Sequence, residues 1–233
     1  MTVDLEFLQS VPYFSGLSPN DLETIGQSCL EKRAERDEMI MMEGERSDAL
    51  YTVVSGVVKL FKTSAEGKEQ ILRLARPGES LNDVSVFDGG TNPTSAQAMG
   101  PVVICGISKN DLDAIIKDHP QVTANVNRTL AGRIRQLMSL VEDLSFRHVV
   151  DRVAKILLEH TDDGASAPPR LTQREMAALA GTAREVIGRS LKALEQAGAI
   201  KMDRHRIVVL DRAALRDMAG ISAPGKEPAR PVG

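Results

Sequence analysis

Three charged side chains with the spacing of one helical face carry the most specific chemistry in this sequence. Arg184, Glu185 and Arg189 lie in the segment LTQREMAALAGTAREVIGRSLKALEQ, residues 171–196. An arginine can donate two parallel hydrogen bonds to guanine O6 and N7, and a glutamate can accept one from cytosine N4. Gly188 stands between them and would let a helix lie close to a nucleic-acid backbone. The pattern predicts a surface that reads base edges in DNA.

The residues around this surface predict two short helices joined by a tight turn. Thr172 followed by Glu175 is the capping-box pattern that begins a helix. Gly181 is expected to end that helix with a positive φ, and Thr182 to cap the next one. Such a helix-turn-helix places its second helix in the major groove. The residues expected to contact DNA are Thr172, Arg174, Thr182, Arg184, Glu185, Gly188, Arg189, Lys192, Arg204 and Arg206.

Charge is distributed unevenly along the chain, whose formal net charge is -3. Residues 1–117 carry eighteen acidic and eleven basic side chains, a net charge of -7. Residues 170–206 carry eight basic and four acidic side chains, a net charge of +4. The basic stretch extends into residues 199–210, which read as a hairpin wing with Arg204 and Arg206 near phosphates. Only the C-terminal part is therefore expected to meet a polyanion.

A β-rich region is predicted over about residues 33–107. Glycine-containing turns separate its apolar, β-branched runs, which lie at 49–54, 57–62, 70–74 and 102–107. Short strands at this spacing favour a small antiparallel barrel or jelly roll. Ser18 and Ser108 are expected to cap helices on either side of it.

Pro120 begins a long helical pattern with heptad-like apolar spacing. Its apolar residues are Val122, Val126, Leu130, Ile134, Leu137, Val141 and Leu144. A seam of about six turns exceeds the face that a small barrel can cover, so it favours a dimer of paired helices. Packing of this helix on its own barrel is the alternative. A further helix is expected at 147–160, followed by a polar, proline-containing connection at 161–169.

Composition excludes several classes of site. The chain has two cysteines, Cys29 and Cys105, which cannot supply the four thiolates of an iron–sulfur cluster. Both are expected to stay reduced in a cytoplasmic protein. No apolar run is long enough to span a membrane, and the N-terminus lacks the pattern of a signal peptide. No nucleophile elbow, phosphate loop, metal-ligand spacing or Rossmann glycine motif occurs, so an enzyme is not expected.

Over about residues 5–212 the chain resembles the cAMP receptor protein/FNR (Crp-Fnr) superfamily of bacterial transcription regulators. The resemblance lies in the long central helix, in the segment Thr172 to Arg189, and in the motifs Gly44-Glu45, Gly56, Gly67-Lys68-Glu69 and Pro77-Gly78-Glu79. It implies an α+β protein with an N-terminal antiparallel β jelly-roll (cyclic-nucleotide-binding-like) effector domain over 1–117. Three further parts are expected after it: a dimerisation helix over 118–145, a winged helix-turn-helix DNA-binding domain over 146–220 and a disordered tail over 221–233.

The resemblance also implies what the C-terminal domain reads. Arg184, Glu185 and Arg189 match the base-reading positions, and members with the pattern R-E-x-x-G-R prefer half-sites resembling TGTGA. We therefore expect a homodimer on a palindrome whose half-sites lie about one helical turn apart, working with RNA polymerase. The runner-up is a ligand-binding module without DNA activity.

The family's phosphate-binding segment falls at residues 82–96 and differs from that of the cAMP-binding members. Those members open it with Gly and Glu and close it with Arg-Ser, whereas Asn82-Asp83 and Thr94-Ser95 stand here. A cyclic phosphate without that arginine lacks charge-assisted donors, so cAMP is not the expected effector. Leu137 and Met138 stand where those members carry hydroxylated residues that face adenine. The expected effector pocket comprises Asn82, Asp83, Val84, Ser85, Thr94, Ser95, Leu137 and Met138.

The identity of the effector stays open at this point. One alternative is a haem-based sensor of NO or CO, in which Cys105 or Met138 could ligate iron, although no histidine lies in the barrel. A second is a small apolar or anionic organic ligand between barrel and central helix. The third is that no ligand binds.

Overall fold

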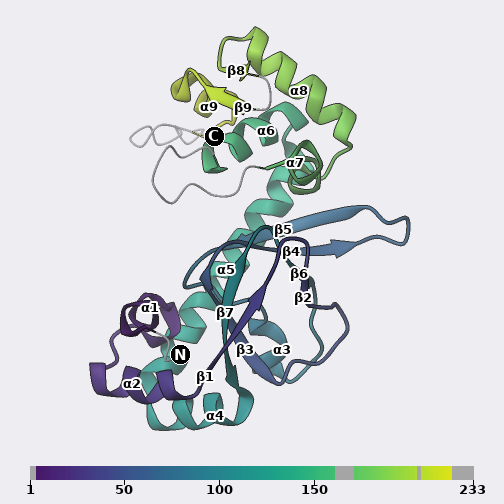
Figure 1. Cartoon of the computed structure of the whole chain (residues 1–233). Coiled ribbons are helices and arrows are strands. Elements are labelled where there is room, and N and C mark those ends of the chain that lie inside the picture. Colours follow the sequence, from purple (N-terminus) through teal and green to yellow (C-terminus); the bar gives the residue numbers. More distant parts are fainter. Residues whose placement is uncertain (1–3, 161–170, 204–205, 222–233) are drawn as a thin grey trace, which may run out of the picture. The chain divides into compact units, whose positions relative to one another are not determined.

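The computed structural model describes residues 4–160, 171–203 and 206–221 (Figure 1). The chain divides into two compact units, Met1–Leu140 and Val141–Gly233. The boundary between the units falls inside the long helix α5 (Pro120–Phe146), which lies where the sequence predicts the dimerisation helix at 118–145. The connection at 161–170, Arg204 and His205, and residues 222–233 of the predicted tail lie outside the described residues.

Two antiparallel sheets form the β-roll of the first unit, as predicted. One sheet has the order β1-β7-β3, from β1 (Cys29–Ala34), β7 (Val102–Ser108) and β3 (Ala49–Ser55). The other has the order β2-β6-β4-β5, from β2 (Met39–Met41), β6 (Ser95–Ala98), β4 (Val58–Thr63) and β5 (Glu69–Ala75). Apolar side chains from both sheets form one core cluster, which includes Val53, Val58, Leu60, Ala96 and Ile104. Removal of these side chains from water is the main force that holds the sheets together.

A second apolar cluster lies where helices pack on the β-roll. The helices are α1 (Leu5–Ser10), the 3-10 turn η1 (Pro12–Phe14), α2 (Pro19–Gln27), α4 (Lys109–Asp118) and the first half of α5. Ser18 and Ser108 cap α2 and α4, as the sequence predicts. A short helix, α3 (Asp83–Asp88), begins the 82–96 segment and was not predicted from the sequence; Asn82 precedes it without making a side-chain capping hydrogen bond.

The dimer seam predicted along the whole of α5 is wrong for its first two residues. Val122 and Val126 are 0% and 7% exposed and belong to the second apolar cluster, so they cannot contact another chain. Leu130 is partly buried against the same cluster. The apolar residues of α5 become exposed only from Ile134 onwards, because the first half of the helix packs on its own domain.

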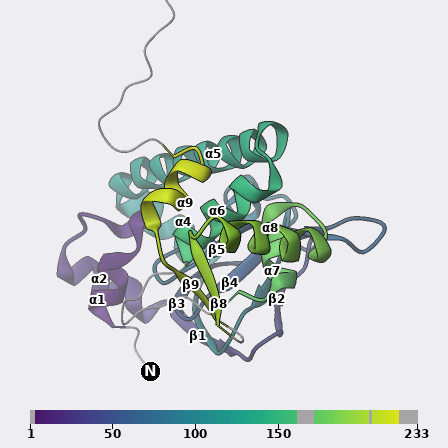
Figure 2. The same ribbon diagram turned by 90° about the horizontal axis from the view of Figure 1, so that it is seen from above.

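The second unit is a helical bundle with a small hairpin. It contains α6 (Val149–His160), α7 (Gln173–Ala180), α8 (Arg184–Gln196), β8 (Ile200–Asp203), β9 (Arg206–Val209) and α9 (Arg212–Met218). Figure 2 shows β8 and β9 side by side, which confirms the predicted wing. Val153, Ile187, Leu191, Leu194 and Leu215 are among the residues that form its core. Among the described residues, none of the helices has the length and apolar character needed to cross a bilayer.

The turn before β4 requires glycine for two reasons, and this gives a stability prediction. Gly56 has φ 86°, and an added Cβ would lie 2.4 Å from the Pro101 carbonyl oxygen. Gly44 has φ 84°, but a Cβ there would meet no atom within 4 Å. Gly44→Ala should therefore lower the free energy of unfolding by only about 1–2 kcal/mol, the cost of a left-handed backbone at a residue with a Cβ. Gly56→Ala should lower it by clearly more, because the clash adds to that cost. Urea unfolding of both variants measures the difference, and equal losses would contradict the predicted clash.

Candidate nucleic-acid interface and effector pocket

The start and the end of α7 follow the sequence prediction. The Thr172 hydroxyl accepts a hydrogen bond from the Glu175 N–H at 3.2 Å, and the Glu175 carboxylate accepts one from the Thr172 N–H at 2.6 Å. Gly181 ends the helix in the left-handed conformation, with φ 65°. The predicted capping box and glycine turn are thereby confirmed.

The predicted cap of α8 is wrong. Thr182 lies in the turn, where its N–H donates to the Ala177 carbonyl at 3.0 Å and closes the end of α7. The helix begins only after Ala183, which offers no side-chain hydrogen bond to it. Because no side chain caps α8, the backbone N–H groups of its first turn are available to an anionic partner such as a phosphate.

Packing fixes which face of α8 meets solvent. Ile187, Leu191 and Leu194 are at most 1% exposed and pack in the core of the second unit. Arg184, Glu185 and Arg189 are exposed on the outer side. An amphipathic helix held in this way cannot turn its charged residues inward without exposing its apolar face. The three predicted base-reading side chains therefore share one solvent-facing surface.

The remaining predicted DNA-contacting residues are also accessible where the structure describes them. Thr172, Arg174 and Lys192 are exposed on α7 and α8, and Arg206 is exposed at the start of β9. A Cβ at Gly188 would meet no atom within 4 Å, so internal packing does not require this glycine. Arg204 lies outside the described residues.

Arg152 on α6 supports the turn of the helix-turn-helix, a role that sequence reasoning did not find. Its Nε donates to the Ala180 carbonyl at 2.8 Å, and its Nη1 donates to the carbonyls of Arg147 at 2.7 Å and Asp143 at 3.3 Å. The Asp143 carboxylate in turn pairs with Lys155 and, at 2.8 Å, with Arg147 Nε. No local pattern singles out Arg152, because α6 also carries the charged residues Asp151, Lys155 and Glu159. This network ties the end of α5 to the end of α7.

The polar residues of the predicted effector pocket mostly hold their own loop in place. Asn82 is 2% exposed, accepts from the Tyr51 N–H at 3.0 Å and donates to the Ala49 carbonyl at 2.7 Å. Ser85 Oγ lies 2.7 Å from Asn92 Oδ1, and Ser95 Oγ accepts from the Glu43 N–H at 3.0 Å. These bonds anchor the 82–96 segment to the β-roll.

The apolar members of the predicted pocket are exposed to solvent. Val84, Leu137 and Met138 are 49%, 48% and 66% exposed. Thr94, at the position where the cAMP-binding members carry arginine, is buried and brings no charge. None of the eight predicted residues lines the cavity that the structure describes in this unit.

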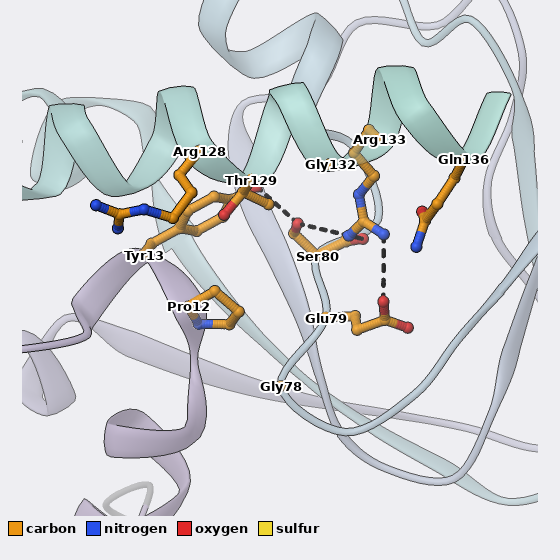
Figure 3. A pocket seen from close by; sticks show the side chains of 10 residues that line it. All are labelled: Pro12, Tyr13, Gly78, Glu79, Ser80, Arg128, Thr129, Gly132, Arg133 and Gln136. Atoms are coloured by element: carbon orange, nitrogen blue, oxygen red, sulfur yellow. Dashed lines mark hydrogen bonds and ion pairs between the residues drawn. The ribbon is translucent and has the colours of Figure 1, made fainter. Parts of the chain in front are cut away.

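That cavity, of about 290 Å³, lies between η1, the loop after β5 and α5 (Figure 3). Its lining residues are Pro12, Tyr13, Gly78, Glu79, Ser80, Arg128, Thr129, Gly132, Arg133 and Gln136. Arg133 pairs with Glu79 Oε1 and with Asp83 Oδ2, both at 3.2 Å. The Tyr13 hydroxyl lies 2.8 Å from Ser80 Oγ, and burial, followed by the Asp83 charge, raises the pKa of Tyr13. Burial, with the neighbouring Arg133 charge, lowers the pKa of Arg73 to about 10.

The structure brings the two cysteines together, although they are far apart in sequence. Cys29 on β1 and Cys105 on β7 occupy adjacent strands and are both free thiols. A hydrogen bond from the Cys105 thiol lowers the pKa of Cys29 and raises that of Cys105. Among the described residues, no three His, Cys, Asp or Glu side chains lie close enough together to bind a metal ion.

Two family models match separate parts of the chain. A cyclic nucleotide-binding domain matches residues 31–119, and a Crp-like helix-turn-helix domain matches residues 151–218. The first match covers the two sheets and α4, and the second covers α6 to α9.

Whole-chain relatives agree with both matches. The chain is 32% identical over 213 residues to the "Cyclic AMP receptor protein" of Thermus thermophilus, covering 91% of this chain and 98% of that protein. It is 29% identical over 213 residues to the "CRP-like cAMP-activated global transcriptional regulator" of Mycobacterium tuberculosis, covering 88% and 95%. The solved structure of FixK2 from Bradyrhizobium japonicum shares the fold, with a TM-score of 0.74 at 24% identity and coverage of 84% and 99%.

The two threonines near the turn give a matched pair of stability predictions. Thr172→Ala removes a hydroxyl that caps α7 and should lower the free energy of unfolding by about 1 kcal/mol. Thr182→Ala leaves the backbone hydrogen bond to Ala177 intact and should lower the free energy of unfolding by clearly less. Urea unfolding of the full chain compares them. A larger loss for Thr182→Ala would show that this hydroxyl caps α8 after all.

Proposed function

The chain belongs to the Crp-Fnr superfamily of transcription regulators, a non-enzymatic family, and from this premise we propose that it binds TGTGA-like palindromes as a homodimer. One observation carries the proposal: Arg184, Glu185 and Arg189 project together from the exposed face of a helix whose other face is buried. Solvated charges on a surface helix are common, but these three follow a capped helix and a glycine turn in the order that base recognition needs.

In the proposed complex, α8 enters the major groove with its N-terminal end. Arg184 and Arg189 donate to guanine, and Glu185 accepts from cytosine. Gly188 lets α8 approach the groove closely. The first-turn N–H groups of α8, together with Thr172, Arg174, Thr182, Lys192, Arg204 and Arg206, contact phosphates and set the register of the helix without reading sequence.

The second half of α5 supplies the proposed dimer contact. Ile134, Leu137, Val141 and Leu144, which we call the apolar seam, are 59%, 48%, 63% and 38% exposed in the single chain. An exposed apolar stripe of this kind is costly in water and typical of a helix that pairs with another. Two-fold pairing would present two α8 helices to the two halves of a palindrome.

We further propose that the effector is not cAMP, although two relatives are named for cAMP. Thr94 offers no guanidinium to a cyclic phosphate, and the buried Asn82 side chain fills the start of the loop. Arg133 is already paired with Glu79 and Asp83. We also propose that the regulator acts on RNA polymerase in the cytoplasm. Haem binding stays a prediction that an absorption spectrum of the purified protein would test.

Gel-shift titrations on a palindrome of two TGTGA half-sites test DNA recognition. Arg184→Ala should weaken binding by about 1–3 kcal/mol and relax the preference at one base pair, because a bidentate guanine contact is lost. Arg36→Ala, which removes an exposed arginine of the first unit, is the charge-matched control and should bind normally. Equal binding to a scrambled palindrome would refute the motif, and no DNA binding at all would favour the ligand-binding module.

The dimer is tested by a charge placed in the apolar seam. Leu137→Glu should give a monomer in size-exclusion chromatography with light scattering, because each chain loses about 1.5–3 kcal/mol of apolar burial and buries a charge. Ala124→Glu puts the same charge on an exposed part of α5 outside the seam and should stay dimeric. A Leu137→Glu protein that remains dimeric would place the interface elsewhere.

The effector proposal is tested by calorimetric titration with cAMP. No binding is expected at micromolar concentrations, since the loop lacks a charge-assisted phosphate donor. The Thermus thermophilus protein, which is named a cyclic AMP receptor, serves as the positive control. Micromolar binding to the present chain would overturn the proposal.

A further inference from the structure

The only two cysteines of the chain lie on neighbouring strands of the first unit. Cys29 is the first residue of β1, Cys105 lies within β7, and the two strands pair antiparallel. Cys29 stands opposite Ile107, and Cys105 stands opposite Glu31. The two cysteines are therefore diagonal neighbours, offset by two residues. Side chains with this offset point to the same face of a sheet, where they can meet.

The face that the two cysteines share is the one covered by helices. Cys105 is 2% exposed and belongs to the apolar cluster that also contains Leu22 and Ile25 of α2. Cys29 packs against the same cluster but stays partly accessible to solvent. The Cys105 thiol donates a hydrogen bond to the Cys29 sulfur, so the two sulfur atoms are in contact. One sulfur is thus open to a small reagent, and its neighbour is shielded by the core.

Packing alone gives no reason for this pairing. A buried core side chain contacts about 6–12 others, so two residues placed at random in a chain of 233 would touch in only about 3–5% of cases. In a core, a free cysteine behaves as a small apolar residue, and other small apolar residues fill the same space. The property that sets a pair of cysteines apart from two such residues is the chemistry of the thiol.

Cys29 has the features of the more reactive thiol. The hydrogen bond from the Cys105 thiol lowers the pKa of Cys29. The same hydrogen bond, together with burial, raises the pKa of Cys105. The thiolate is the form of cysteine that attacks an oxidant, and attack also requires access. Both conditions select Cys29 as the nucleophile, while Cys105 keeps its proton until a later step.

We propose that hydrogen peroxide converts Cys29 and Cys105 into a disulfide within the chain, and that thiol reductants reverse it. The Cys29 thiolate attacks one peroxide oxygen. The S–O bond forms, the O–O bond breaks, and the leaving hydroxide takes up a proton to give water. The Cys105 sulfur then attacks the Cys29 sulfenic acid. The S–S bond forms, the S–O bond breaks, and the hydroxide leaves with the Cys105 proton as a second water. Two thiols are oxidised by two electrons in total, and one peroxide is reduced.

The geometry of the strands favours a bond that is easily reduced again. Diagonal neighbours have Cα atoms about 7–8 Å apart, whereas a disulfide usually spans at most about 6.8 Å, so the strands must close by about 1 Å. β1 is an edge strand whose described pairing is with β7 alone, and Cys29 lies at its end, where such a movement is available. A disulfide that holds the backbone away from its relaxed position is more reducible than an unstrained one.

The bond would fix the junction between α2 and β1. Ser28 alone separates the end of α2 from Cys29, and Leu22 and Ile25 of α2 pack in the same cluster as Cys105. Oxidation would therefore reach the helical side of the β-roll. This chemistry needs neither DNA nor an effector, so failure of the gel shifts would leave it standing, and its own failure would leave the DNA proposal standing.

Thiol counting on the full chain tests the disulfide. Maleimide labelling after denaturation should find two free thiols per chain before peroxide treatment, none after it, and two again after dithiothreitol. A non-reducing tryptic digest of the oxidised chain should contain peptide 1–32 joined to peptide 74–109. Peroxide also oxidises the nine methionines, but their sulfoxides do not change the thiol count.

Two serine variants separate the roles of the cysteines. Cys105→Ser should leave Cys29 reactive, so that peroxide yields a sulfenic acid that dimedone traps in place of a disulfide. Cys29→Ser should slow the loss of the remaining thiol at least about tenfold, because Cys105 is buried and has a raised pKa. Cys105→Ala repeats the first test with a residue that needs no hydrogen-bond partner in the core.

Three results would overturn the proposal. One is wild-type protein that keeps both thiols at a peroxide concentration that oxidises Cys29 in Cys105→Ser. Another is a disulfide between two chains, seen as a dimer on a denaturing, non-reducing gel. The third is a Cys105 thiol that is lost equally fast in Cys29→Ser and in the wild type, which would remove Cys29 as the nucleophile.

Discussion

The orientation of α8 about its own axis depends on the burial of Ile187, Leu191 and Leu194. These side chains contribute apolar area to the core of the second unit, and rotating the helix would expose all three to water. The cost of that exposure holds Arg184 and Arg189 on the solvent side. The capping box at Thr172 and the Gly181 turn set where the helices begin and end, and Arg152 fixes the turn by donating to the Ala180 carbonyl. The charged face of α8 is therefore presented to solvent because the opposite, apolar face of the helix is buried.

The long helix α5 uses different faces for different tasks. Val122 and Val126 bury one face in the first unit, and Ile134 and Leu137 expose another. A third face, at Gly132 and Arg133, lines a cavity.

The 82–96 segment shows how a shared fold can hold different chemistry. The cyclic nucleotide-binding family model matches residues 31–119, which include this segment. In this chain the polar side chains of the segment mostly form hydrogen bonds within the protein. Asn82 bonds to two backbone groups of β3, and Ser95 Oγ accepts a hydrogen bond from the Glu43 N–H. The nearby positive charge comes from Arg133 and Arg73 instead, and it is balanced internally by Glu79 and Asp83.

Local sequence determined the features that depend on a few neighbouring residues. The capping boxes, the glycine turns, the strands between them and the exposed triad of α8 follow from propensity and periodicity, so they could be predicted without any coordinates. Periodicity also gave the length of α5, but it could not tell which apolar residues face a partner, because burial of Val122 and Val126 depends on where α1, α2 and α4 pack. Three features join residues that are distant in sequence: the cavity at Gly132, the contact between Cys29 and Cys105, and the hydrogen bond from Arg152 to the Ala180 carbonyl. Only the tertiary structure decides such contacts, because they depend on which elements lie side by side.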